Sequence, residues 1–396
     1  MGSEAIAEGS SLTVERLLAI AAEHTPNRQI FEADQRIAQA LVTQAEAWSN
    51  PEIDVEGGRA WANDGEHLSI GRVGVRQRFE LPEKRSRRIE AARSQQALAT
   101  WDAQWLRVEL DQAVHEASIR VAVVQLRIPE SEQSALLAHH VLDTVKRRLD
   151  AGEATRSDWL RAQVDALQTD QERDRGQRGL VAARGALDAL CAGALPATYS
   201  VIVDLDDLPD VSLDQTLEFA RVQNPRWQQL DAVVEQRRRE IQREEAAADP
   251  DLTVGAFTGR EADSRSVGVT LGVEVPLWNR NQGGIALARA QLARDEAERA
   301  QQQKAIRAEI QAAWFGYDQA VRRVTSFAES LSPSAKEALT LAIHSYEAGE
   351  SSLLDVLDAR RTAQQVVRSH LDAVEDAQLA RIRLDRAAGR LPEARP

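Results

Sequence analysis

The stretch YEAGESSLLDVLDARRT, residues 346–362, has a weaker counterpart in LDAGEATRSDWLRAQVD, residues 149–165. In each copy a glycine separates two helical patterns, and an aspartate follows the glycine six residues later. Glycine adopts the left-handed backbone conformation that ends a helix without steric cost. We therefore expect Gly152 and Gly349 to mark two turns at which long helices reverse direction.

The two glycine segments belong to a longer internal duplication. SLTVERLLAIAAEHTPNRQ from residue 11 aligns with SLDQTLEFARVQNPRWQQ from residue 212, and VGVRQRFELP (73–82) aligns with VGVTLGVEVP (267–276). We predict two structural repeats, residues 11–196 and 212–392. A flexible tail at residues 1–10 precedes them, and a linker at residues 197–211 with one short extended piece joins them.

Hydrophobic periodicity changes in the same order within each repeat. A helical pattern is broken at Pro26 or Pro225, because proline cannot donate the helical hydrogen bond and restricts the residue before it. Two stretches of period two follow, as in residues 267–275, where valine and leucine alternate with glycine, threonine and glutamate. This alternation predicts four amphipathic strands per chain.

A helical period then continues over most of the remainder of each repeat. The apolar residues follow a four-three spacing, and the two copies of the pattern lie 196 positions apart, which is typical of a coiled-coil seam. The seam positions are Leu110, Val114, Ala117, Val121, Val124 and Ile128, and Ile306, Ile310, Ala313, Tyr317, Ala320 and Val324. We expect Pro129 and Pro333 to interrupt these helices.

Composition and motifs exclude several classes of function. The net charge of −13 disfavours binding to nucleic acid, because both partners would repel each other. No P-loop, HExxH, GxSxG or paired-cysteine signature is present, so we predict neither an enzyme nor a cofactor. The seven histidines show no chelating spacing, so no metal site is predicted. No stretch approaches the roughly 18 apolar residues of a membrane-spanning helix, and the start shows no secretory signal.

Four amphipathic strands are too few to close a barrel, and an open sheet leaves unpaired edges. Three copies would supply twelve strands, so cyclic association is the simplest closure. We predict a mainly α fold with a β-barrel portion: an elongated barrel of long coiled-coil helices plus four strands per chain, completing a 12-stranded barrel as a trimer. The alternative is a soluble periplasmic coiled-coil scaffold or adaptor protein without channel activity.

The duplicated order of elements, with YEAGESSLLDVLDARR before the last helix, resembles the TolC-type outer-membrane efflux channels. FELPEKRSRRIEAA from residue 79 and VPLWNRNQGGIALARA from residue 275 are similar to the heavy-metal (CzcC-like) branch of this family. The resemblance covers residues 11–389. It implies a homotrimer in the Gram-negative outer membrane that extends into the periplasm. It also implies docking to a periplasmic membrane-fusion adaptor and an inner-membrane pump of the resistance-nodulation-division type.

The resemblance assigns roles at the two glycine turns, which form the periplasmic tip in such channels. Asp355 and Asp358 correspond to an acidic constriction, and Asp158 and Tyr346 correspond to groups that hold the closed aperture. From spacing alone, Asp355 and Asp358 share a helix face, so a trimer would place six carboxylates around one aperture. Carboxylates in the first turn of a helix are also expected simply to favour the positive end of its dipole.

One departure from the family pattern concerns the closed state. The family has an arginine two residues after the second glycine, but Ser351 stands there in this chain. Arg156 and Arg161 are the candidate substitutes. The sequence does not define the exported ion.

Overall fold

The computed structural model describes residues 9–61, 67–261 and 264–390. Contacts divide the chain into two compact units, each built from both halves of the sequence. The first takes in the described residues of Met1–Gln29, Gln104–Asn224 and Ala305–Pro396, and the second those of Ile30–Ala103 and Pro225–Lys304. The strands predicted from period two therefore belong to the second unit, and the glycine turns belong to the first.

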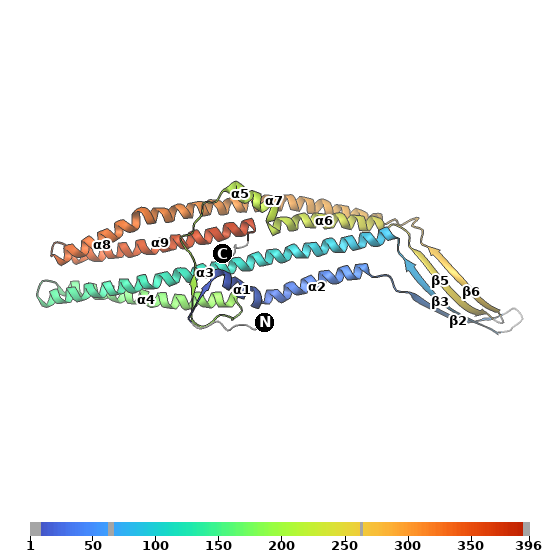
Figure 1. The fold of residues 1–396 in the computed structure, drawn as a ribbon, viewed down its shortest axis with the longest axis horizontal. Coiled ribbons are helices and arrows are strands. Elements are labelled where there is room, and N and C mark those ends of the chain that lie inside the picture. The colour runs from blue at the N-terminus through green and yellow to red at the C-terminus, as the bar shows by residue number, and fades with distance from the viewer. Residues whose placement is uncertain (1–8, 62–66, 262–263, 391–396) are drawn as a thin grey trace. The chain divides into compact units, whose positions relative to one another are not determined.

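The elements follow the same order in each half of the chain (Figure 1). The first half contains α1 (Val14–His24), α2 (Pro26–Glu46), β2 (Glu52–Trp61), β3 (His67–Phe79), α3 (Pro82–Asp150) and α4 (Arg156–Leu190). The second contains α5 (Leu213–Gln223), α6 (Pro225–Ala246), β5 (Leu252–Glu261), β6 (Ser264–Val273), α7 (Gln282–Ser326), a π-helical turn (Phe327–Leu331), α8 (Ser332–Glu347) and α9 (Leu353–Ala388). Pro26 and Pro225 begin α2 and α6, where a missing N–H is tolerated. The predicted breaks are confirmed.

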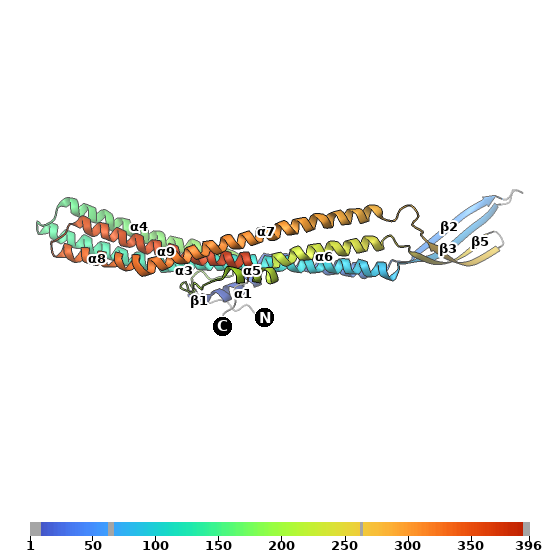
Figure 2. The same cartoon turned by 90° about the horizontal axis from the view of Figure 1, so that it is seen from above.

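The second unit contains a four-stranded sheet of order β2-β3-β5-β6, with every neighbouring pair antiparallel. Figure 2 labels β2, β3 and β5 of this sheet. The four predicted strands are confirmed. Their register aligns Val55 with Val73 and Ala256 with Val269, so apolar side chains gather on one face. These side chains are 46% to 85% exposed; they include Ile53, Val55, Val73, Val75, Val267, Val269, Leu271 and Val273. Within the described residues, β2 and β6 each have one strand neighbour, so the sheet stays open.

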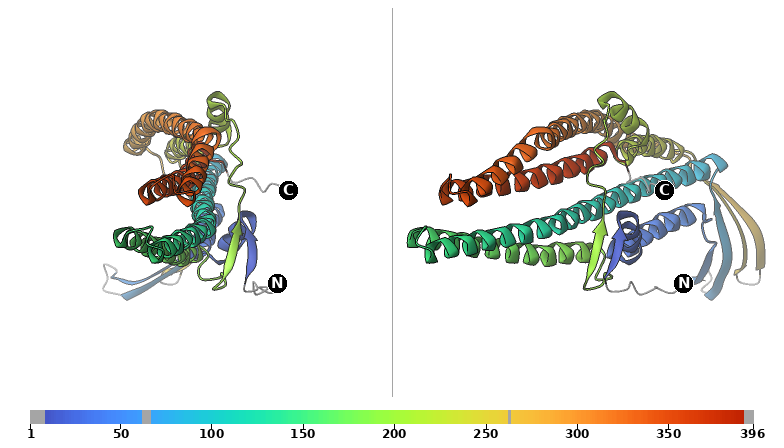
Figure 3. Two further views of the ribbon diagram at one scale, coloured as in Figure 1. Left: turned by 90° about the vertical axis from the view of Figure 1, so that its left-hand side faces the viewer. Right: turned by 60° about the vertical axis from the view of Figure 1, so that its left-hand side comes forward.

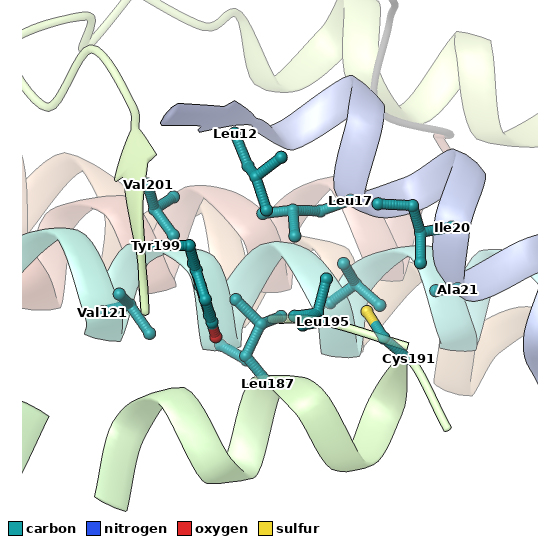
Figure 4. Packing of buried hydrophobic residues seen from close by; sticks show 12 residues of the cluster. Leu12, Leu17, Ile20, Ala21, Val121, Leu187, Cys191, Leu195, Tyr199 and Val201 are labelled. Carbon is teal, nitrogen blue, oxygen red and sulfur yellow. The ribbon is translucent and has the colours of Figure 1, made fainter. Parts of the chain in front are cut away.

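The first unit has a hydrophobic core that joins both ends of the first repeat. β1 (Ser10–Thr13) pairs in parallel with β4 (Tyr199–Ile202), which is the extended piece expected in the linker. Leu17 and Leu187 are fully buried against these strands. Tyr199 reaches towards α4 (Figure 4), where its hydroxyl donates to the carbonyl oxygen of Arg184 at 3.1 Å. β1 was not predicted, because its four residues pair with a segment nearly 190 positions away.

The long helices of the first unit pack through the predicted seam. α4 runs back along the C-terminal part of α3, and α9 runs back along α8 (Figure 3). Val114, Val121 and Ile310 are fully buried, and Ile306 and Tyr317 are 2% and 3% exposed. The seam prediction is confirmed at these positions. Among the described residues, no helix is long and apolar enough to cross a membrane.

The expected interruption at Pro129 is wrong, because α3 continues through this residue for 69 residues in total. Buried alanine and valine side chains precede and follow Pro129, from Val123 to Ala135, so packing outweighs the loss of one hydrogen bond. Near Pro333 the helix does change. The π-helical turn Phe327–Leu331 inserts there, and Pro333 lies in the first turn of α8, where its N–H is not needed.

Leu187→Ala is expected to lower the free energy of unfolding by about 3 kcal/mol, because it leaves a cavity in a closely packed core. Val181→Ala lies on the same helix at a side chain that is 70% exposed and should cost less than about 0.5 kcal/mol. Denaturant unfolding of the purified protein, followed by circular dichroism, measures both. Equal midpoints for the two variants would contradict the assignment of Leu187 to the core.

Candidate functional site

The two glycine turns of the first unit share one backbone geometry. Gly152 follows α3 with φ +79°, and Gly349 follows α8 with φ +78°. In each turn, the N–H of the residue after the glycine donates to the carbonyl oxygen four residues before the glycine, at 2.8 Å. This bond belongs to the Schellman motif that ends many helices. A side chain at either glycine would strain the backbone.

Asp158 and Asp355 are placed immediately after the turns, at the third position of α4 and α9. Each forms a capping box: Thr155 and Ser352 accept hydrogen bonds from the aspartate N–H groups, and the carboxylates accept from the Thr155 and Ser352 N–H groups at 3.2 and 2.9 Å. Hydrogen bonds from these hydroxyls lower the pKa of both carboxyls. Both aspartates therefore start a helix and stay ionised at neutral pH.

Asp358 lies one turn further along α9 than Asp355, and both side chains are exposed. Among the described residues, no ion pair joins either carboxylate to a basic side chain within 4.0 Å. The structure thus places the two predicted carboxylates together on one exposed helix face. Their negative charge is available to a cation in solution.

Tyr346 lies in a small core that joins the two turns. It is 7% exposed and packs in a cluster drawn from α3, α4, α8 and α9: Val141, Val145, Ala162, Tyr346, Leu353, Val356 and Leu357. Burial raises the pKa of Tyr346; the charge of Arg148 opposes this shift, and the charge of Asp158 adds to it. The ring is therefore uncharged at neutral pH and serves as an apolar anchor.

Arg148, which the sequence analysis missed, makes the contact between the turns. Its Nη1 donates to the carbonyl oxygen of Tyr346 at 2.9 Å, and its guanidinium lies 4.8 Å from the centre of the Tyr346 ring. Arg156 and Arg161 were the predicted substitutes for the family's arginine. Arg161 Nη1 lies 3.9 Å from Asp158 Oδ1 on the same helix, and Arg156 is exposed. Arg148 lies in the last turn of α3, where the helix dipole favours a basic residue whether or not that residue has another role.

A second contact between the repeats is the buried ion pair of Asp165 on α4 and Arg360 on α9. Both side chains are 3% exposed, and Arg360 Nη1 also donates to Ser134 Oγ at 3.4 Å. Removing one partner of such a pair leaves an uncompensated buried charge, which typically costs about 3–5 kcal/mol. Sequence reasoning missed this pair because neither residue stands in a recognisable motif.

A shallow hollow opens beside the turns. It is lined by His140, Thr144, Arg147, Arg148, Glu153, Glu347, Ala348 and Gly349. His140 Nε2 lies 3.9 Å from Glu347 Oε1 across the hollow. Within the part of the chain that the structure describes, no three histidine, cysteine or acidic side chains gather closely enough to hold a metal ion. Charged groups of both signs therefore line this surface.

The fold is that of outer-membrane channels of known structure. The superposition on the solved structure of CusC covers 95% of this chain and 92% of the CusC chain, with a TM-score of 0.80 and 18% sequence identity. A membrane protein from Pseudomonas aeruginosa gives a TM-score of 0.78 at 21% identity, with 95% and 92% covered. VceC from Vibrio cholerae gives a TM-score of 0.75 at 17% identity, with 95% and 96% covered.

Sequence comparison agrees with the fold. Residues 216–390 match the family model described as "Outer membrane efflux protein". The cobalt-zinc-cadmium resistance protein CzcC of Cupriavidus metallidurans is 27% identical over 383 residues, which is 96% of this chain and 90% of that protein. The second half of the chain thus resembles the outer membrane efflux protein family, and nearly the whole chain is similar to CzcC.

Ser352→Ala is expected to destabilise the start of α9 by about 1 kcal/mol, the usual contribution of an N-cap side chain. The pKa of Asp355 is lower in the folded chain, so its contribution is present at neutral pH and lost as pH falls through the folded pKa. Thermal unfolding at pH 7 and pH 3 should therefore show a smaller acid-induced loss of stability in the variant than in the unmodified protein.

The matched control for this experiment is Ser369→Ala. Ser369 lies further along α9, and its hydroxyl accepts from the exposed Gln365 amide at 3.1 Å. This variant should keep the full pH dependence. If Ser352→Ala shows the same pH dependence as Ser369→Ala, the capping box does not set the protonation of Asp355.

Proposed function

We propose that the chain forms a homotrimeric outer-membrane channel that conducts heavy-metal cations out of the periplasm. In this proposal it works in a tripartite system with a periplasmic adaptor and an inner-membrane pump of the resistance-nodulation-division type. The observation that carries the proposal is the sheet of the second unit, which is open at both edges and exposes an apolar face. The relationship to a cobalt-zinc-cadmium resistance protein supports metal cations as the cargo.

The strand geometry supports closure by identical copies. β2 and β6 each have ten residues, and the alternating directions along β2-β3-β5-β6 make β6 antiparallel to β2. The β6 strand of one copy can therefore pair in antiparallel fashion with β2 of the next. Three copies give twelve strands, an even number as in other outer-membrane barrels.

The side-chain pattern supports a barrel in lipid. The valine and leucine face is suited to hydrocarbon, whereas the opposite face carries polar groups such as Asp54 and Arg76, which pair at 2.6 Å. A soluble scaffold would expose the apolar face to water, and large exposed apolar patches are rare on soluble proteins. This is why the channel is favoured over the soluble coiled-coil scaffold.

The acidic residues at the turns support cation passage. In a trimer, the exposed Asp355 and Asp358 of α9 would place six carboxylates around one aperture. The lowered pKa of Asp355 keeps its charge at neutral pH. A ring of ionised carboxylates concentrates cations and repels anions, without the tight binding that would prevent release.

The combined variant Asp355→Asn/Asp358→Asn is expected to lose most of its cation preference, because it removes all six charges while preserving side-chain size. The reversal potential in a planar bilayer under a salt gradient measures this preference. Asp376→Asn, on the same helix about 27 Å from Asp358, is the control and should leave the reversal potential unchanged. Unchanged selectivity in the double variant would contradict the acidic aperture.

Deletion of the gene is expected to lower the tolerated concentration of cobalt, zinc or cadmium ions by several-fold, and re-expression should restore it. Growth on graded metal concentrations measures the effect. The protein should also fractionate with the outer membrane and migrate as a heat-sensitive trimer, as a closed barrel of three chains would. Unchanged metal tolerance in the deletion strain would contradict the proposed cargo.

A further inference from the structure

The segment of residues 275–281, which joins β6 to α7, exposes two large apolar side chains. Leu277 is 59% exposed, and Trp278 is 89% exposed, the largest exposed fraction of any large apolar side chain among the described residues. The period of two in β6 continues into the segment, since Val273, Val275 and Leu277 are all more than half exposed. The exposed apolar surface of the sheet therefore continues past the end of the strand.

Hydrogen bonds fix the conformation of this segment. Asn281, with φ +55°, donates from Nδ2 to the carbonyl oxygen and to Oε2 of Glu244 on α6, at 2.9 and 2.7 Å. Arg280 Nε donates to the carbonyl oxygen of Pro276 at 3.3 Å. Glycine at 284 permits the close approach, because a Cβ atom there would clash with Asn281 and Glu244. The exposed apolar side chains are therefore held on a fixed backbone.

The internal duplication does not account for this segment. In the alignment of the repeats, Pro276 corresponds to Pro82, where α3 begins at once. The counterpart of Trp278 is Lys84, which pairs with Asp251 at 2.8 Å. The same end of the hairpin therefore carries a paired cation in the first repeat and an exposed tryptophan in the second. An exposed apolar side chain is not needed to connect a strand to a helix here.

We propose that residues 275–281 bind phospholipids at the periplasmic surface of the outer membrane and so fix the depth of the channel in the bilayer. Leu277 and Trp278 enter the boundary between headgroups and acyl chains, and the guanidinium of Arg280 binds a lipid phosphate. The inference rests on the proposed function, because it takes the four-stranded sheet as part of a barrel in lipid.

Strand length places the segment at the membrane boundary. β6 has ten residues, and its last residue lies at the end of the sheet that leads into the helices. A strand of that length extends about 33 Å, and a tilt of about 40° reduces its height to about 25 Å, which matches the apolar band of outer-membrane barrels. Residues 275–281 therefore lie just outside the hydrocarbon. Tryptophan is enriched at this depth, because its ring is apolar and its N–H can remain hydrated.

Arg280 supplies a charge that suits a phosphate. Its side chain is exposed, and it forms no ion pair with a carboxylate of the described residues. A guanidinium binds phosphate oxygens through parallel N–H donors. Because Nε already donates to the Pro276 carbonyl oxygen, the side chain is oriented before a lipid binds.

A second tryptophan lies at the same end of the sheet. Trp48 precedes β2 by four residues and is 58% exposed, and the guanidinium of Arg85 lies 4.9 Å from the centre of its ring. β2 and β6 are the edge strands, so each edge carries a tryptophan and an arginine at its helical end. In the proposed trimer, Trp48 of one copy and Trp278 of the next would lie at the same seam. Both edges are therefore suited to the headgroup layer.

A protein partner is the other occupant that an exposed tryptophan could accept. A stable protein interface buries about 800 Å² from each partner, whereas one large aromatic side chain buries about 150–250 Å². Leu277 and Trp278 together supply too little area for such an interface. Their surface also continues the apolar face of the sheet, which the proposed function places in lipid. Phospholipid is therefore the favoured occupant.

The first test measures quenching of tryptophan fluorescence by brominated lipids. The purified full-length protein is placed in vesicles of phosphatidylethanolamine and phosphatidylglycerol, with bromine either near the headgroups or near the chain ends. Trp278→Phe should remove a fluorescence component that shallow bromine quenches about two-fold more strongly than deep bromine. Trp159→Phe is the matched control, because Trp159 packs against the core of the glycine turns. Equal quenched components in the two variants would overturn the proposal.

The second test counts phospholipids that remain bound to the trimer, by native mass spectrometry after release from the same vesicles. Arg280→Gln should lower this number by about one per chain, because the phosphate loses its charged donor. Arg280→Lys should retain more lipid than Arg280→Gln. Arg294→Gln is the control, since Arg294 pairs with Glu298 of its own helix at 3.0 Å. Equal retention in Arg280→Gln and Arg294→Gln would overturn the phosphate contact.

The outcomes separate this inference from the proposed function. If the protein conducts in vesicles but lipid bromine does not reach Trp278, the anchor is wrong and the channel stands. If aqueous iodide also fails to quench Trp278, protein covers the side chain, which equally overturns the proposal. If the unmodified protein stays out of the vesicles, the proposed function fails first. If Trp278→Phe does not assemble, the comparison of Arg280→Gln with Arg294→Gln decides the inference.

Discussion

The proposed channel depends above all on how the backbone N–H and C=O groups at the two edges of the four-stranded sheet find hydrogen-bond partners. Within the described residues, β2 and β6 each have a strand on one side only. In a hydrocarbon environment, each unpaired N–H or C=O group would cost several kcal/mol. An even number of strands with alternating directions lets identical copies satisfy every edge by antiparallel pairing. The internal duplication explains the even number, since each repeat contributes one hairpin and β3 joins β5 across the repeats.

Charged contacts position the second repeat against the first within the unit that carries the turns. Arg127 of α3 pairs with Asp372 and Glu375 of α9 at 2.6 and 2.8 Å, and Asp165 pairs with Arg360 in a nearly water-free setting. Buried pairs often add little net stability, because both charges lose water on burial. Misalignment of α9 would nevertheless leave these charges unpaired. The pairs therefore favour one register of packed helices whose alanine-rich surfaces would otherwise allow several.

Local patterns predicted the elements well, and long-range contacts account for what was missed. The alternation in residues 267–275 reports a sheet with one apolar face, and the four-three spacing around Val114 and Val121 reports a buried seam. Neither pattern can reveal β1, whose pairing partner is distant in sequence, nor the continuity of α3 through Pro129, which depends on packing against other helices. At the turns, the glycines and aspartates can be recognised in the sequence because they occur in both repeats. Arg148 cannot, because its position in the second repeat is occupied by Ser345.

The capping role of Asp355 is compatible with its proposed role at the aperture, because the two roles use different properties of one carboxylate. The capping box uses the hydrogen-bonding capacity of Oδ2, which accepts from both the N–H and the hydroxyl of Ser352. A ring of carboxylates, by contrast, uses net charge, and mutual repulsion within such a ring favours protonation. The capping hydrogen bonds and the helix dipole act in the opposite direction, since both stabilise the ionised form. A helix N-terminus is therefore a physically suitable place for an acidic constriction: the bonds that start α9 would also keep the proposed ring charged when three copies bring these carboxylates together.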